Sequence, residues 1–421
     1  MRIWIVEIGE PIPLEPGVRL LRYGCFSEWL VAAGHDVTWW LSGFSHAPKR
    51  EIVDRDCAAW WQGVRLQFIK SCGYRRNISL ARLAHNRDFA ARFQCLAAHS
   101  IEHGGRPDVL IAPVPTIEIV GAARRISQRY RIPLVVDIRD EWPDEIVDLA
   151  PRWLRPVTKL AFRGGYAEMR RACKSATAIV AVSERYLKYG LCFADRVRSP
   201  TDAVIPLGYT INTVSAEAMD DARRWRAGLA LISNAFTVCF FGTIGRFFDL
   251  ETLIVAAKRL EHEFPFQLLL GGDGSTSARF RQLASDSSNV RFLGWLTAAQ
   301  IAAIMEVSHA GIAPYKHTAR MSLPNKPFEY MAGGLPVIST LKGELKELLA
   351  TERCGATYYA RSADDLCAVI RRLHDCDAER RAMGKRAYRL VSTKFDADRI
   401  FNRYLRLLRA AVDTFPAAYR D

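Results

Sequence analysis

The sequence lacks long hydrophobic runs, metal-type cysteine patterns and low-complexity tracts. A helix that spans a bilayer needs about 18–20 consecutive apolar residues. None occurs in the 421 residues, so we expect no transmembrane helix. The ten cysteines are scattered, without a C-x-x-C pair or a Cys/His cluster of metal-ligand spacing. This usage predicts reduced structural thiols in a cytoplasmic protein and no metal site.

Acidic residues are scarce relative to basic ones, and the formal net charge is +14. Such a surface attracts nucleic acid, anionic lipid or phosphorylated substrates. The chain has no zinc finger, basic zipper or aromatic RNA-binding motif, which argues against nucleic acid. Residues 151–200 mix many cations with Trp153, Leu154, Leu160 and Phe162, and a second basic run covers 74–93. This composition is typical of a helix on an anionic membrane surface and equally of an ordinary charged outer face.

Short apolar runs, by contrast, are abundant and alternate with helical patterns. We expect strands at 2–9, 36–42, 64–70, 108–114, 133–139, 178–183 and 203–208, and again at 236–243, 266–272, 290–295, 310–314, 336–340 and 355–360. Several are apolar at nearly every position, which predicts parallel strands covered on both faces. Alternation with helices predicts right-handed crossovers and a doubly wound α/β fold.

The strand series begins a second time near residue 236, and the length of the chain fits two domains. We expect one Rossmann-like domain at 1–212, a second at 213–395, and a C-terminal helix at 396–421 that returns to the first domain. The polar stretch 209–235 is the linker candidate. Two such domains would face a central crevice, with ligands at the carboxyl ends of the strands.

In the second domain, three loops after strands carry ligand-binding patterns. Residues 242–246, GTIGR, and 271–274, GGDG, let backbone approach a phosphate closely, although both patterns also form ordinary turns. In PNKPFEYMAGG, Asn325 or Lys326 would cap a short helix that begins at Pro327. Glu329 would then lie in the first turn, either as a dipole partner or as a clamp for two adjacent hydroxyls.

The stretch PNKPFEYMAGGLPVIS (324–339) resembles the nucleotide-sugar motif of GT-B glycosyltransferases of family 4, in the branch that builds bacterial surface polysaccharides. Further elements of this family resemblance follow in the family's order: GHDVTWWLSGFSH (34–46), VVDIRDEWPDE (135–145), FFGTIGRFFDLETLI (240–254), GGDG (271–274) and VRFLGW (290–295). The chain departs from the family pattern at Met321, where many members have a sugar-contacting glutamate, and at Arg139, where many have a histidine.

The resemblance implies retaining transfer of a sugar from a nucleotide diphosphate donor, a UDP-sugar in preference to a GDP-sugar. The donor-binding residues it implies are Gly242, Thr243, Gly245, Gly272, Asp273, Gly274, Asn325 and Glu329. Arg246 and Lys326 would stabilise the leaving diphosphate. Arg139 and Asp140, or Glu141, would act at the reacting centre unless an Arg139–Asp140 pair only braces the loop. Arg19 and Arg22 would face an anionic acceptor, unless they only start a solvated helix.

The resemblance further implies a saccharide or polyprenyl-diphosphate-linked acceptor. No Asp-x-Asp metal motif stands in the expected loop, so we expect no obligatory metal or other cofactor. The basic runs, together with a lipid-linked acceptor, predict loose attachment to the inner face of the membrane. A front-face attack, in which the leaving phosphate helps to deprotonate the acceptor, fits the lack of an evident carboxylate nucleophile. Two alternatives remain open from the sequence. One is another sugar-nucleotide enzyme, such as an epimerase, and the other is a basic nucleic-acid-binding protein.

Overall fold

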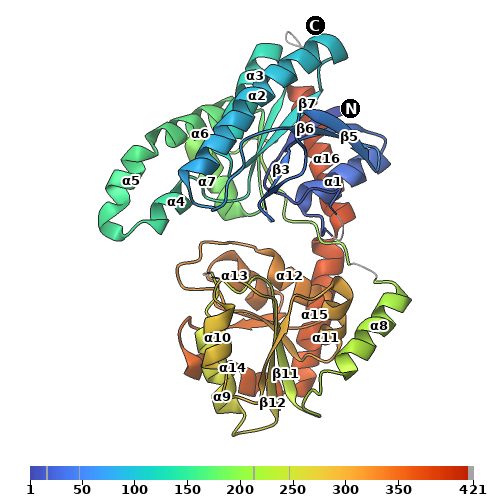
Figure 1. The fold of residues 1–421 in the computed structure, drawn as a ribbon, viewed down its shortest axis with the longest axis vertical. Coiled ribbons are helices and arrows are strands. Elements are labelled where there is room, and N and C mark those ends of the chain that lie inside the picture. Colours follow the sequence, from blue (N-terminus) through green and yellow to red (C-terminus); the bar gives the residue numbers. More distant parts are fainter. Residues whose placement is uncertain (16–17, 47, 212–213, 246, 416–421) are drawn as a thin grey trace. The chain divides into compact units, whose positions relative to one another are not determined.

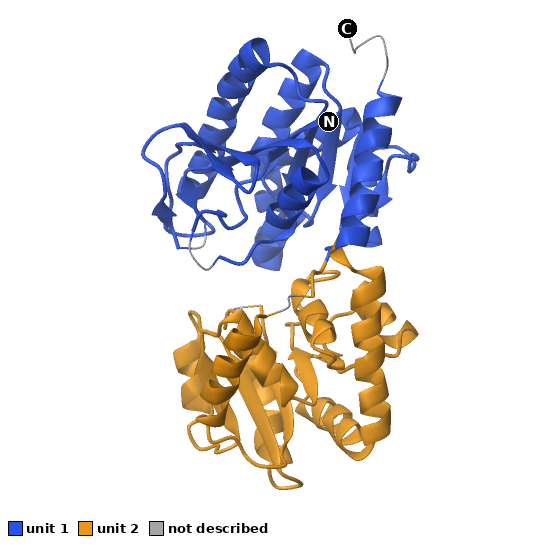
Figure 2. Cartoon of the chain, turned by 90° about the vertical axis from the view of Figure 1, so that its right-hand side faces the viewer, with its two compact units in different colours: residues 1–208, 398–421 blue, residues 209–397 orange. Residues whose placement is uncertain are grey.

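The computed structural model of the protein describes residues 1–15, 18–46, 48–211, 214–245 and 247–415. Contacts divide the chain into two compact units (Figure 2). Unit 1 comprises Met1–Gly208 and Asp398–Asp421, and unit 2 comprises Tyr209–Ala397. The expected domain boundary between residues 212 and 213 lies outside the described residues.

Unit 1 is built on an eight-stranded sheet in the order β10-β9-β8-β7-β1-β2-β6-β5. Its strands are β1 (Arg2–Val6), β2 (Asp36–Ser42), β5 (Cys57–Trp61), β6 (Val64–Ile69), β7 (Val109–Val114), β8 (Leu134–Ile138), β9 (Ala178–Ala181) and β10 (Ala203–Val204). All seven strands expected in this half are confirmed, and they pair in parallel. The sequence does not predict the edge strand β5. It pairs antiparallel with β6, and neither of its faces is fully buried, so it lacks the apolar run of the others.

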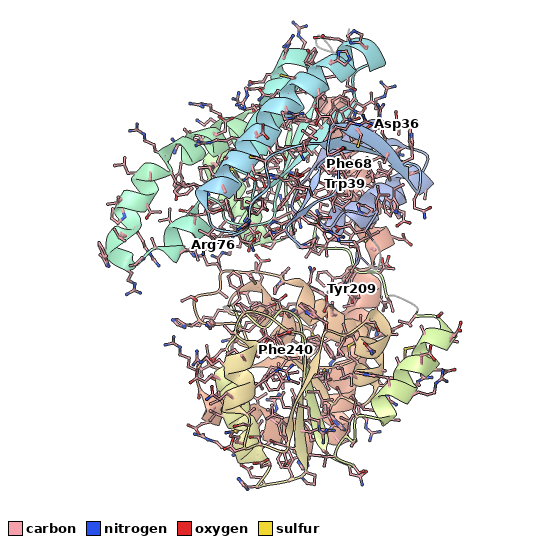
Figure 3. The ribbon with its side chains drawn as sticks, in the orientation of Figure 1. Asp36, Trp39, Phe68, Arg76, Tyr209 and Phe240 are labelled. Atoms are coloured by element: carbon pink, nitrogen blue, oxygen red, sulfur yellow. The ribbon has the colours of Figure 1, made fainter. Side chains whose placement is uncertain are left out.

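Helices cover both faces of this sheet (Figure 1). They are α1 (Arg22–Ala32), α2 (Leu80–Gly104), α3 (Ile117–Tyr130), α4 (Asp144–Leu149), α5 (Arg155–Ala161), α6 (Arg163–Ser175), α7 (Glu184–Ala194) and α16 (Ala397–Thr414), with a 3₁₀ turn η1 (Arg152–Leu154) before α5. Two short strands, β3 (Phe44–Ser45) and β4 (Arg50–Glu51), pair with each other. Trp39 and Phe68, both in the sheet, are buried in the interior (Figure 3).

Helix α16 packs against unit 1, as the apolar stripe of the sequence predicts. Tyr404 stacks on Phe26 of α1 with ring centroids 4.7 Å apart, and Ile400 and Leu408 are fully buried. The preceding helix α15 (Asp377–Lys394) belongs to unit 2 and packs against α12. Only the last helix of the chain therefore returns to the first half.

Unit 2 contains a six-stranded parallel sheet in the order β13-β12-β11-β14-β15-β16. Its strands are β11 (Phe236–Phe241), β12 (Phe266–Gly271), β13 (Val290–Gly294), β14 (Ala310–Ala313), β15 (Val337–Ser339) and β16 (Gly355–Thr357). Its other helices are α8 (Ala216–Ala227), α9 (Leu250–Leu260), α10 (Ser277–Leu283), α11 (Ala298–Glu306), α12 (Asn325–Ala332), α13 (Glu344–Thr351) and α14 (Ala363–Asp375). The six strands expected here are all confirmed.

The stretch expected as a linker contains helix α8, which corrects that prediction. The Ser215 hydroxyl caps the helix by accepting from the Ala218 amide. Arg223 and Arg226 both pair with Glu306 of α11, at 2.5 and 2.8 Å. The polar composition of α8 therefore serves an ion-paired helix on the surface of unit 2 and does not indicate a flexible connection.

All ten cysteines are free thiols. Within the described ranges, no helix has the length and apolar character that crossing a membrane requires.

Candidate functional site

In the unit 2 sheet, β11 and β14 are neighbours although β12 and β13 lie between them in sequence. The chain leaves β11 toward β12 on one side and leaves β14 toward β15 on the other. At such a switch point the loops after the two strands diverge and leave room for a ligand. The loop after β11 and the amino end of α12, which follows β14, both lie at this edge.

Helix α12 begins at Asn325, earlier than the sequence predicts. Pro324 is its N-cap residue, no side chain caps it, and Pro327 is the third helical residue. Glu329 therefore lies in the second turn, and the first turn contains no acidic residue. The expectation that Glu329 offsets the helix dipole from the first turn is wrong. Pro324 is extended, so the helix starts directly after it, two residues before Pro327.

Lys326 places its ammonium group directly against the backbone at Gly242. A Cβ atom at Gly242 would fall 1.8 Å from Lys326 Nζ, and the backbone there has φ +136°. Only glycine adopts that conformation freely and leaves space for the amine. The Nζ atom also lies 5.6 Å from the ring centroid of Phe240 and 5.2 Å from that of Phe248. Backbone and ring faces thus position one cation at the end of β11.

The loop after β12 packs tightly onto the loop after β11. The Gly242 amide donates to Gly271 O at 2.8 Å, and the Ile244 amide donates to Asp273 O at 2.9 Å. A Cβ at Gly272 would fall 1.9 Å from Gly242 O. These glycines therefore join two loops, and the Gly242 amide is already used within the protein. The Asp273 carboxylate accepts from the Gly274 amide at 2.8 Å, which is turn chemistry.

Two backbone amides of the loop after β11 remain available. Among the described residues, the N–H groups of Thr243 and Gly245 have no acceptor. Thr243 is exposed, as is Asn325 at the start of α12. Arg246, expected to contribute charge here, lies outside the described residues. The arrangement offers amides, a helix amino end and one ammonium group, which together suit a bound anion.

Helix α12 is held in place by Tyr330. Its hydroxyl accepts from the Phe241 amide at 3.1 Å and donates to Ile312 O at 3.0 Å, so it ties the helix to β11 and β14. Glu329 precedes it and is half-buried. Burial, and then the charge of Glu329, raise the pKa of Tyr315 at the end of β14. The carboxylate of Glu329 therefore lies near the switch point, one turn beyond Lys326.

At the corresponding edge of the unit 1 sheet, Arg139 lies among glutamates. Its Nη1 donates to Glu10 at 2.9 Å and lies 3.5 Å from Glu7. Burial opposes the charge of Arg139, but Glu10 and Glu7 outweigh this and raise its pKa. The expected brace between Arg139 and Asp140 is thus replaced by a pair with Glu10. Burial raises the pKa of Glu7 to about 7.

Sequence reasoning missed Glu7 and Glu10. Both are buried, and Glu10 also accepts from the amides of Tyr23 and Gly24 at the start of α1. The available signal was their position directly after the buried strand β1. Their partner Arg139 is 129 positions from Glu10 in sequence, and only the sheet brings the three together.

Asp140 and Glu141 differ in availability. Both oxygens of Glu141 accept from the Arg185 guanidinium at 2.6 Å, so this carboxylate is held in a bidentate ion pair. Burial, and then the charge of Glu145, raise the pKa of Asp140 to about 7 against the lowering effect of Arg139. Of the two carboxylates, Asp140 is the one suited to exchange a proton near neutral pH.

Arg22 does not face an acceptor, contrary to the expectation. Its Nε donates to Asp137 at 3.0 Å, and the two side chains are 1 % and 0 % exposed. The hydroxyls of Tyr23 and Tyr404 also reach Asp137, at 2.5 and 3.4 Å. A residue buried this completely and paired in this way supports the fold. Arg19 is exposed at the approach to α1.

Comparison with known proteins gives two family matches that follow the division into units. Residues 26–208 match the family described as "Glycosyl transferase 4-like domain", and residues 235–376 match "Glycosyl transferases group 1". No curated protein sequence matches the chain.

Several solved structures share the fold over almost the whole chain. Sucrose-phosphate synthase from Thermosynechococcus elongatus has a TM-score of 0.73 at 18% identity, covering 97% of this chain and 98% of that one. HepE from Anabaena in complex with UDP has 0.68 at 17%, covering 97% and 100%. WaaG, a glycosyltransferase involved in lipopolysaccharide biosynthesis, has 0.62 at 16%, covering 99% and 100%.

The two Rossmann-like units and these neighbours show that the chain has the GT-B fold. On this fold, the family matches to both halves make the chain a glycosyltransferase, with a glycosyltransferase-4-like first half and a group 1 second half.

Proposed function

We propose that the protein is a retaining glycosyltransferase that moves a sugar from a UDP-sugar to a saccharide acceptor. The observation that carries the proposal is Lys326 Nζ seated against Gly242 at the β11–β14 switch point, with Glu329 one helical turn further on. This arrangement offers a cation for a diphosphate and a carboxylate for ribose hydroxyls. HepE, a structural neighbour, is described in complexes with UDP and with UDP-glucose, which supports a UDP-sugar donor.

In the proposed reaction, the bond between the anomeric carbon and the diphosphate oxygen breaks as the acceptor oxygen attacks from the same face. Negative charge accumulates on the leaving diphosphate. Lys326, Arg246, and the amides of Thr243 and Gly245 stabilise this charge where it develops. The acceptor proton passes to a leaving phosphate oxygen or to Asp140. No obligatory metal is proposed, and loss of turnover with EDTA that Mg²⁺ or Mn²⁺ restores would contradict this.

The remaining donor contacts follow the same proposal. Glu329 holds the ribose hydroxyls, Asn325 lies at the helix end near the diphosphate, and the Gly272–Gly274 loop supports the position of Gly242. Arg139 acts as a positioning residue, because it is engaged by Glu10 and Glu7. Arg19 remains the proposed contact to an anionic acceptor.

We place the enzyme in surface-polysaccharide synthesis, with an acceptor linked to polyprenyl diphosphate at the inner face of the membrane. The basic balance of the chain supports such a peripheral enzyme, since anionic lipid attracts it. The test is transfer to synthetic lipid-linked acceptors compared with the corresponding free saccharides. Equal rates with both would contradict a role for the lipid.

The central test is a thermal-shift series with UDP-, GDP- and ADP-sugars. We expect UDP-sugars to stabilise the wild type and to stabilise Glu329→Ala much less. The matched control Glu347→Ala, which changes an exposed glutamate of α13, should be stabilised as strongly as the wild type. Full stabilisation of Glu329→Ala would refute its role. A second measurement tests the stereochemistry: NMR of the product shows whether the anomeric configuration of the donor sugar is retained. If the protein instead forms epimerised sugar nucleotide when no acceptor is present, the epimerase alternative is favoured.

A further inference from the structure

The segment between α4 and α6 is unusual because its helix has no buried residue. Neither η1 nor α5 contains one. Three of its large apolar side chains are strongly exposed: Trp153 at 77%, Val157 at 63% and Leu160 at 64%. Figure 1 shows α5 at the outer end of unit 1, beyond α4 and α6. A short helix gains its stability mainly by burying an apolar face, so this one has an apolar face without a cover.

The exposed side chains form two adjacent stripes. Trp153, Val157 and Leu160 follow spacings of four and three residues and therefore lie on one face of the segment. The cations Arg152, Arg155, Lys159 and Arg163 follow spacings of three, four and four and form the neighbouring stripe. An apolar stripe with a tryptophan, bordered by long cationic side chains, is the pattern of a helix that lies in a membrane interface.

The structure also separates this element from the broader basic region 151–200. Six cations of that region are paired with carboxylates: Arg155 with Asp148, Arg171 with Glu168, Lys174 with Asp195, Arg185 with Glu141, Arg196 with Asp202 and Arg198 with Glu184. In contrast, no described carboxylate lies within ion-pair distance of Arg152, Lys159 or Arg163. Arg170 and Lys188 also have no described carboxylate within ion-pair distance, so three of the five such cations in the region lie beside the exposed apolar stripe.

We propose that η1 and α5 form a docking element that inserts Trp153, Val157 and Leu160 into an anionic lipid bilayer, while Arg152, Lys159 and Arg163 contact phosphate headgroups. The proposed partner is lipid, because three cations without a described carboxylate partner border the apolar stripe, which matches a surface of anionic phosphates. Arg155 instead fixes α5 on α4, because it pairs with Asp148 at 3.1 Å and donates to the carbonyls of Asp148 and Ala150.

A second exposed stretch adjoins the loop that leads into α4. Ile78 and Leu80 are 56% and 84% exposed at the start of α2. Arg82, one turn further on, lies 5.8 Å from the ring of Trp142. Because Trp142 follows Asp140 closely in that loop, the bilayer would lie beside the edge proposed for the acceptor. This last step rests on the proposed function, whereas the docking itself does not.

The test is flotation of the full-length protein with phosphatidylcholine vesicles that contain or lack phosphatidylglycerol. We expect the wild type to bind only the anionic vesicles, and the double variant Trp153→Ser/Leu160→Ser to bind about tenfold more weakly or less. The matched control is Trp60→Ser, which removes a tryptophan that is 68% exposed on β5 of the same unit. It should bind as the wild type does. Arg152→Gln/Lys159→Gln should weaken binding to anionic vesicles in particular.

The same experiment separates failure of docking from failure of the enzyme assignment. Stabilisation by UDP-sugars should persist in the double variant, because the variant changes only exposed side chains of unit 1. Three results of the flotation assay would overturn the docking proposal: the double variant binds as strongly as the wild type, Trp60→Ser loses as much binding as the double variant, or the wild type does not bind at low salt. A fourth would come from sedimentation, if the wild type is a dimer and the double variant is a monomer that binds vesicles as the wild type does.

Discussion

At the carboxyl edge of the unit 2 sheet, the ammonium group of Lys326 touches the backbone of Gly242 and two phenyl rings. At the same edge of unit 1, Arg139 is surrounded by Glu7 and Glu10. The first cation lies against backbone and beside aromatic rings, and a lysine can adjust its position to a phosphate. The second is fixed by charged hydrogen bonds and a rigid guanidinium plane.

This difference extends below the two edges. In unit 1, Asp137 of β8 accepts from Arg22 and from Tyr23, both of α1. The Tyr404 hydroxyl brings α16 into the same buried cluster. In unit 2, neutral groups such as the Tyr330 hydroxyl tie α12 to the strands. Unit 1 therefore uses buried charge for its architecture, whereas in unit 2 the neutral hydrogen bonds of Tyr330 tie the helix that carries Lys326 to the sheet. Four variants test this comparison.

Arg22→Met should have the largest effect, since it leaves Asp137 buried without its cation. We expect a loss of about 3–5 kcal/mol in the free energy of unfolding. The matched control Arg223→Met removes an exposed arginine that pairs with Glu306, and should destabilise the protein far less, because solvent screens such a surface pair. Urea denaturation measures both. Equal costs would show that the Arg22–Asp137 pair has no special role in unit 1.

Lys326→Met should affect the ligand and spare the fold. We expect kcat/KM for the donor to fall by about 10²–10³, because the cation acts where charge develops on the diphosphate. Lys346→Met, at an exposed position of α13, is the control and should behave as the wild type. Hydrolysis or transfer of a UDP-sugar gives the rates. A large loss of stability in Lys326→Met would contradict the comparison.

Gly242→Ala should lower both the stability of the protein, by less than Arg22→Met does, and its affinity for the nucleotide, by less than Lys326→Met does. The added Cβ would meet Lys326 Nζ at a backbone φ of +136°, so the lysine must move and the backbone is strained. We expect about 1–3 kcal/mol of destabilisation and weaker nucleotide binding. In Gly164→Ala no atom lies near the new Cβ, and the change should be neutral or slightly stabilising. Calorimetry with and without UDP separates the two effects.

Asp140→Asn should give the smallest effect, visible mainly in the pH profile. The pKa of Asp140 is raised to about 7, so its carboxylate form, which alone accepts a proton, increases as the pH rises through that value. Wild-type kcat/KM should rise accordingly. In the variant, kcat/KM should be about tenfold lower than in the wild type and should not rise as the pH passes through 7. The pKa of Glu7 is also raised to about 7. If the rise of kcat/KM with pH disappears in Glu7→Gln and persists in Asp140→Asn, the titrating group is Glu7.

Much of the fold was predictable because buried parallel strands are apolar at every position. β2 is an example: its expected bounds, 36–42, are those observed. β5 was not predicted, because this half-covered edge strand of five residues, CAAWW, has no continuous buried apolar run. The predicted start of α12 was wrong because the prediction began the helix at Pro327 and not after Pro324. Either proline is compatible with a helix start. Local pattern was thus reliable wherever burial imposed it.

By itself, the sequence determined two doubly wound units and the loops in which ligand-binding groups lie, because periodicity and glycine positions are local properties. Only the tertiary structure decided which charges meet. It brought Arg139 to Glu10 across 129 positions, buried Arg22 against Asp137, and set Lys326 on Gly242. Side-chain pairing depends on strand order and helix docking, which no single stretch of sequence encodes. For the same reason, the cations of α5 are visible in the sequence, but only the fold left its apolar face uncovered.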